Sequence, residues 1–104
     1  MQQYIVHAWD GTDDKALERR MASRNAHFEN ARKMKAAGSL ILGGAMLNKE
    51  GKMIGSTMVV QFEKPEELQH WLSIEPYIVG NVWERFEVHP FRAADIEKYF
   101  AEMK

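Results

Sequence analysis

The 104-residue chain contains no cysteine, no long apolar run and almost no net charge. The absence of cysteine excludes disulfides, thiolate metal ligands and a cysteine nucleophile. No apolar stretch approaches the roughly 18 consecutive residues that a membrane-spanning helix needs. Because 14 basic and 15 acidic residues are interspersed along the chain, no basic patch indicates nucleic acid or an anionic membrane as a partner.

The rest of the composition is typical of a soluble globular domain. Hydrophobic residues make up 45% of the chain and charged residues 28%, and both fractions are ordinary. At this length we expect one domain over residues 1–104, with its core at about 3–92. Met1 leads directly into a strand-like run, without the basic and apolar regions of a secretory signal, so we expect a cytoplasmic protein.

The hydrophobic pattern predicts a βαββαβ order followed by a terminal helix. Strands are expected at residues 4–9, 40–47, 54–62 and 82–91, with helices from the acidic cluster at 10–14 to about 37, from 65 onward, and at about 93–103. Gly38 is a natural residue to end the first helix, and Pro65 to begin the second. This order predicts an α+β, ferredoxin-like fold, whose helices cover one face of a four-stranded antiparallel sheet.

The other face of this predicted sheet also carries apolar residues. Along the first strand, the two alternating sets are Tyr4, Val6 and Ala8 against Ile5, His7 and Trp9. A sheet face exposed to water is normally polar at alternate positions. We therefore expect a second subunit to cover it, in a homodimer or a higher homo-oligomer.

Three basic residues lie on the apolar side of the long predicted helix. At about 100° per residue, the apolar stripe runs through Leu17, Met21, Phe28 and Ala31. Arg24 falls in the middle of this stripe, and Arg20 and His27 lie on one flank. Burying an unpaired charge is costly, so these side chains need a partner. The partner is either a carboxylate of the fold or an anionic ligand.

Five separated stretches, in this order, resemble those of a known family. They are Asp10 after the first strand, residues 17–27, which are similar to the family's helix with its two arginines and its histidine, Gly55-Ser56-Thr57, Glu75-Pro76-Tyr77 with Gly80, and His89-Pro90-Phe91. The chain resembles the YciI-like, or YCII-related, proteins over residues 4–92. That resemblance implies a dimeric α+β barrel of ferredoxin-like subunits, each a single YciI-like domain. The family's reaction is mostly unestablished, although a few members remove HCl from chlorinated lactones.

The resemblance also implies an active site around the helix histidine and the carboxylate before Pro-Tyr, here His27 and Glu75. The family's carboxylate is usually aspartate, so the glutamate is a departure. Imidazole can accept or donate a proton near neutral pH, and a carboxylate can orient it and stabilise its cation. The candidate substrate-binding residues are Arg20, Arg24, Ser56, Tyr77 and Asp10.

These residues indicate isomerisation or elimination on a small carboxylated or lactone metabolite. The arginines would hold its negative charge, and the hydroxyl groups would bond a carbonyl or leaving group. We expect no organic cofactor and no metal, because the four histidines at 7, 27, 70 and 89 show no ligand spacing.

Other interpretations stay open at this point. In one, the same basic pocket belongs to a non-catalytic small-anion-binding or regulatory domain. In another, His27 only bonds a carboxylate and the arginines neutralise Asp10 and Glu75, since structural ion pairs also use these residue types. A purely structural oligomerisation module would leave the three cations on the core side unexplained.

Overall fold

A computed structural model describes residues 1–98 of the chain. The elements follow the order β1 (Gln2–Asp10), α1 (Ala16–Ala37), β2 (Leu40–Leu47), β3 (Met53–Phe62), α2 (Pro65–Ile74), α3 (Pro76–Val79) and β4 (Trp83–Phe91). An extra helical segment follows β4 and begins at residue 96, so residues 93–95 of the predicted terminal helix are not helical. The remainder of that predicted helix lies outside the described residues.

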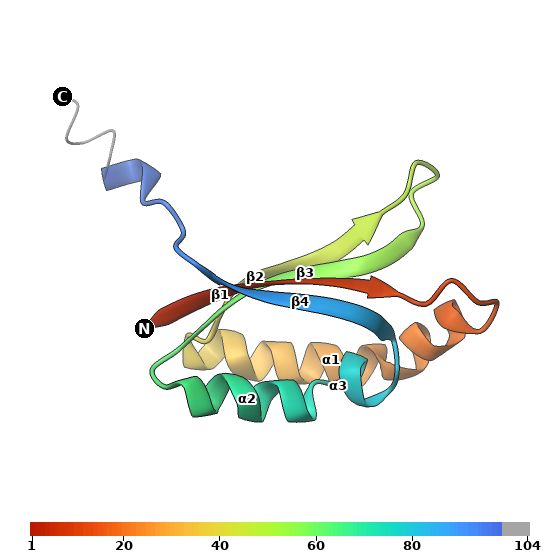
Figure 1. Ribbon diagram of the computed structural model, residues 1–104, viewed down its shortest axis with the longest axis horizontal. Coiled ribbons are helices and arrows are strands. Elements are labelled where there is room, and N and C mark those ends of the chain that lie inside the picture. The colour runs from red at the N-terminus through yellow and green to blue at the C-terminus, as the bar shows by residue number, and fades with distance from the viewer. Residues whose placement is uncertain (99–104) are drawn as a thin grey trace.

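The four strands form one antiparallel sheet in the order β2-β3-β1-β4. All three helices in that element order lie on one face of the sheet, and the opposite face is open (Figure 1). The α+β, ferredoxin-like arrangement predicted from the sequence is therefore confirmed. Within residues 1–98, no helix is long and apolar enough to cross a membrane.

Two local signals determine how the helices end. Gly38 ends α1 in the left-handed conformation, with φ at 82°, which glycine adopts without steric cost. Glu75 ends α2 with φ −57° and ψ 120°, because a residue before proline is pushed out of the helical region. The break at Glu75 places its carboxylate and the ring of Tyr77 beneath the sheet, where both are buried.

The hydrophobic core lies between the sheet and the helices. Its most completely buried apolar side chains, each with at most 3% of its surface exposed, are Val6, Ala8, Met58, Val60, Trp71, Tyr77 and Val82. Residues two apart on β1 and β3 share the helix-facing side of the sheet. The polar side chain of Ser56 and, at the end of β1, that of Asp10 are buried with them.

The buried face of α1 differs from the apolar stripe predicted from the sequence. The residues buried against the sheet are Ala16, Arg20, His27 and Met34. Leu17, Met21 and Phe28 are each more than half exposed, so the predicted stripe was wrong by about a quarter turn of the helix. Arg20 and His27 each contact a buried carboxylate, and this pairing offsets the cost of burying them.

The open face of the sheet carries the alternate residues of each strand. Ile5 of β1 pairs with Val59 of β3, and Val59 pairs with Leu42 of β2. These three side chains form an apolar row across three strands. Beside the row, His7 Nδ1 and Thr57 Oγ1 are 3.0 Å apart.

Candidate active site

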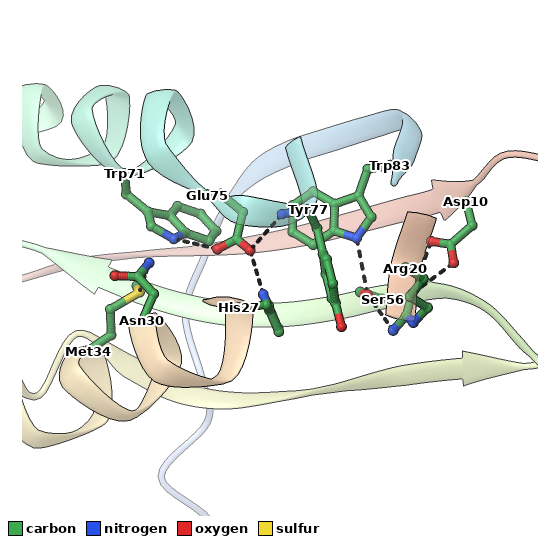
Figure 2. Close-up of polar contacts among 10 residues, drawn as sticks. All are labelled: Asp10, Arg20, His27, Asn30, Met34, Ser56, Trp71, Glu75, Tyr77 and Trp83. Atoms are coloured by element: carbon green, nitrogen blue, oxygen red, sulfur yellow. Dashed lines mark hydrogen bonds and ion pairs between the residues drawn. The ribbon is translucent and has the colours of Figure 1, made fainter. Parts of the chain in front are cut away.

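A buried His–Glu pair joins α1 to the junction of α2 and α3 (Figure 2). Nδ1 of His27 lies 2.5 Å from Oε1 of Glu75, whose side chain is 1% exposed. The indole N–H of Trp71 donates to Oε2 at 3.0 Å, and the backbone N–H of Tyr77 donates to Oε1 at 3.2 Å. An ionised carboxylate only accepts hydrogen bonds, so opposite an ionised Glu75 this contact uses Nδ1–H of His27, and Nε2 of a neutral imidazole is then an acceptor.

The ring of Tyr77 separates this pair from a second polar cluster. Its centroid lies 3.9 Å from that of the His27 imidazole, with the planes inclined by 12°. The guanidinium carbon of Arg20 lies 4.8 Å from the same phenol centroid, and Figure 2 shows Tyr77 between the two side chains. Burial raises the pKa of the phenol, so its hydroxyl group stays protonated and can donate at neutral pH.

The second cluster is centred on Arg20. Its Nη1 donates to both oxygens of Asp10, at 3.0 and 2.9 Å. Its Nη2 donates to Oγ of Ser56 at 3.1 Å, and the indole N–H of Trp83 donates to the same oxygen at 3.1 Å. Since Ser56 Oγ accepts from two donors, its own hydroxyl proton is left for another acceptor.

A cavity of about 460 Å³ opens between α1 and the strands β2 and β3, and both clusters contribute to its wall. His27, Ser56 and Tyr77 line it together with the basic side chains of Arg20, Arg24, Arg32 and Lys35. Within residues 1–98, no aspartate or glutamate lines the cavity. Arg20 is paired with Asp10 and Arg32 with Glu29, so Arg24 and Lys35 supply the remaining positive charge, which favours an anion in this concave site.

The two arginines predicted to bind substrate differ in their surroundings. Arg20 is buried and held by a carboxylate of the fold, as one interpretation of the sequence expects. Arg24 is exposed at the cavity, with its guanidinium carbon 4.7 Å from the ring centroid of Phe28. Among the described residues, no carboxylate forms an ion pair with Arg24. Its charge is therefore available to a ligand.

The other three histidines lie away from the cavity. His7 is on the open sheet face beside Thr57, and His70 and His89 are exposed. Within the part of the chain that the structure describes, no group of three or more histidine or acidic side chains comes together that could hold a metal ion.

The sequence did not identify Trp71 and Trp83 as hydrogen-bond donors to the site. Trp71 precedes Glu75 by four positions, which is one helical turn, so helical spacing was an available signal for this contact. Trp83 reaches Ser56 from a different strand. No local pattern predicts that contact, because it depends on how the strands align.

Comparison with known proteins identifies the family. The model of the YCII-related domain matches residues 3–92. The chain belongs to the YCII-related family. Protein YciI of Escherichia coli is 33% identical over 95 residues, which cover 86% of this chain and 95% of that protein. An uncharacterized protein of Haemophilus influenzae is 28% identical over the same shares of the two chains.

A solved structure has the same fold as this YCII-related chain. It is the 5-chloro-2-hydroxyhydroquinone dehydrochlorinase of Burkholderia phenoliruptrix, in complex with 2,5-dihydroxybenzoquinone. The TM-score is 0.75, and the match covers 90% of this chain and 97% of that one. At 16% identity, the likeness is evidence for the fold alone. The family and fold predicted from the sequence are thus confirmed.

Proposed function

We propose that this chain is a YciI-like enzyme that uses His27 and Glu75 for acid–base chemistry on a small carboxylated or lactone metabolite. The observation that carries the proposal is the set of three N–H donors around one buried carboxylate. With Glu75 held in this way, an ionised carboxylate would fix the imidazole in one tautomer and leave its Nε2 for a ligand. A carboxylate that orients a histidine is a recurring arrangement in acid–base catalysis.

The proposed step is removal of a proton from a carbon next to a carbonyl or carboxylate group. The C–H bond breaks, its proton goes to Nε2 of His27, and its electron pair forms a new double bond. In an elimination, the leaving group departs with its own bonding electrons; in an isomerisation, a proton returns at another carbon. The hydroxyl groups of Ser56 and Tyr77 supply hydrogen bonds to oxygen atoms that gain negative charge.

Arg24 would hold the carboxylate of the substrate beside the base. This role is supported by its exposure at the cavity and by the lack of a carboxylate partner among the described residues. Arg20 and Asp10 would instead keep Ser56 in place, because Arg20 Nη2 donates to the serine oxygen. The dehydrochlorinase with this fold is an enzyme of the elimination class, which agrees with the proposed step.

A second candidate function is binding of a small anion without catalysis. The excess of cations around the cavity supports it equally well. Calorimetry and product analysis with a panel of small carboxylates and lactones would separate the two functions. For the enzyme, we expect His27→Gln to keep affinity and lose turnover, and Arg24→Gln to lose affinity. Turnover that survives in His27→Gln would contradict the catalytic proposal.

We also propose that a second copy of the chain covers the open sheet face. The apolar row of Ile5, Leu42 and Val59 supports this, since Leu42 is 62% exposed in the single chain. Light scattering should give the mass of a dimer, and Ile5→Lys should give a monomer. Ile74→Lys, at an exposed apolar position on α2, is the matched control and should stay dimeric. A monomeric unsubstituted protein would contradict the proposal.

A further inference from the structure

Gly43 lies inside β2, where glycine has no evident backbone role. Its φ is not in the left-handed range, unlike those of Gly38 and Gly51. Glycine in a strand interior weakens the strand, and often marks a place where a ligand or another backbone approaches closely. β2 shifts its register against β3 just before Gly43, between Leu40 and Leu42, but a Cβ at Gly43 would still be 3.8 Å from the carbonyl oxygen of Thr57. The cavity that Gly43 lines offers another explanation for the glycine.

A side chain at position 43 would enter the cavity. Gly43 pairs with Met58, whose side chain is buried on the helix-facing side of the sheet. A Cβ at Gly43 would lie 3.4 Å from Met58 Cγ and 3.9 Å from Leu40 Cδ1, and both of those residues line the cavity. These are ordinary contact distances, so the position can hold a Cβ without a clash.

The next residue on the same side of β2 is also small. Ala45 pairs with Ser56, the serine whose hydroxyl proton is available to a ligand. Gly43 and Ala45 thus contribute little side-chain volume to this side of the cavity. The opposite side is formed by α1, which carries His27 and Arg24. A ligand held by that helix can lie directly against the backbone of β2.

We propose that Gly43 determines the size of anion that the cavity admits. This inference rests on the proposed function, in that it assumes an anionic ligand beside His27. The missing side chain leaves room for the body of a bulky anion, while Arg24 holds its carboxylate. A branched side chain at position 43 would take up that room and exclude bulky anions, but a compact anion at Arg24 would still fit.

The test compares two carboxylate probes, benzoate as the bulky one and acetate as the compact one, in calorimetric titrations. For Gly43→Val we expect benzoate affinity to fall by about ten-fold or more, as overpacking of a filled site does, with acetate affinity unchanged. The melting temperature should not fall, because valine suits a strand better than glycine. Gly44→Val is the matched control: Gly44 lines the cavity with its backbone, but its partner Thr57 faces the open side, and a Cβ there meets no atom of the described residues within 4 Å. Because that side is the proposed dimer face, light scattering would check that the control keeps the mass of the unsubstituted protein.

Each other outcome overturns a distinct claim. Unchanged benzoate affinity in Gly43→Val, or equal loss of both probes, would overturn the role of Gly43 and leave the anion site standing. If Gly44→Val loses benzoate affinity as well, the loss comes from a change in β2 as a whole. That outcome would also overturn the role of Gly43. No binding of either probe to the unsubstituted protein would overturn the carboxylate site at Arg24 and this inference with it. If Gly43→Val does not fold, Gly43→Ala replaces it, and an unchanged ratio of benzoate to acetate affinity would overturn the proposal.

Discussion

The imidazole of His27 lies almost parallel to the phenol ring of Tyr77, with centroids 3.9 Å apart and planes inclined by 12°. The stack fixes the plane of the imidazole, and the hydrogen bond to Glu75 fixes its rotation within that plane. Nε2 is therefore held in one direction before any ligand arrives. A base fixed in advance needs little reorganisation in the reaction, which is a large part of enzymatic rate enhancement.

Glu75→Gln should lower the stability of the protein. The amide keeps the shape of the side chain, but its NH₂ group cannot accept a hydrogen bond. Either the N–H of Trp71 or the backbone N–H of Tyr77 therefore loses its acceptor, the latter together with the contact to His27. We expect the free energy of unfolding to fall by about 2–4 kcal/mol in urea denaturation. Glu50→Gln, at an exposed turn, should change it by less than about 0.5 kcal/mol. Equal stability of the two variants would contradict the network described for Glu75.

Tyr77 should make the protein less stable in alkali. Burial raises the pKa of its phenol above the usual value of about 10. Between the unfolded and folded pKa values, the native state holds a proton that the unfolded state has lost. The free energy of unfolding therefore falls as the pH rises above about 10. Tyr77→Phe removes the phenol, so its stability should fall less steeply than that of the unsubstituted protein. Parallel slopes in urea denaturation across this pH range would refute the prediction.

Removal of Arg20 should destabilise the fold through Asp10. Both side chains are almost completely buried, at 5% and 6% exposed, so Arg20→Gln leaves a buried carboxylate without its cation. We expect a loss of about 3–5 kcal/mol in the free energy of unfolding. Adding Asp10→Asn should recover part of this loss, because it removes the unpaired charge. Fully additive effects of the two substitutions would show that the pair is not coupled.

Substitution of Arg24 should change affinity and leave stability intact. Its guanidinium group is exposed and has no carboxylate partner among the described residues. For Arg24→Gln we expect an unchanged melting temperature and about ten-fold weaker binding of acetate. Arg24→Lys keeps the positive charge and is the matched control, with a smaller loss of affinity. Acetate binding that is equally strong in Arg24→Gln would remove Arg24 from the site.

Much of the fold could be predicted from the sequence because its signals are local. Gly38, Pro65 and the Glu75-Pro76 step mark helix boundaries through backbone preferences that hold in any protein. The pattern of apolar residues along the sequence predicted each strand boundary to within two residues of its position in the structure. The separated motifs then indicated the family, and the family indicated which residues to expect beneath the sheet.

The orientation of α1 could not be predicted in the same way. Apolar periodicity placed Leu17, Met21 and Phe28 in the core, but the buried face carries Arg20 and His27. Hydrophobicity alone cannot indicate that a basic side chain will be buried, because its burial depends on carboxylates elsewhere in the sequence. For His27 the carboxylate is 48 positions away along the chain.

The proposal that His27 removes a proton from carbon is tested most directly by hydrogen exchange in the substrate. Small carboxylates and lactones would be incubated with the protein in D₂O, and deuterium incorporation would be followed by mass spectrometry. The account predicts that at least one compound takes up deuterium at the carbon beside its carbonyl, and that His27→Gln slows this uptake by about 100-fold or more. Uptake at the same rate with His27→Gln, or none in any compound that calorimetry shows to bind, would contradict the account.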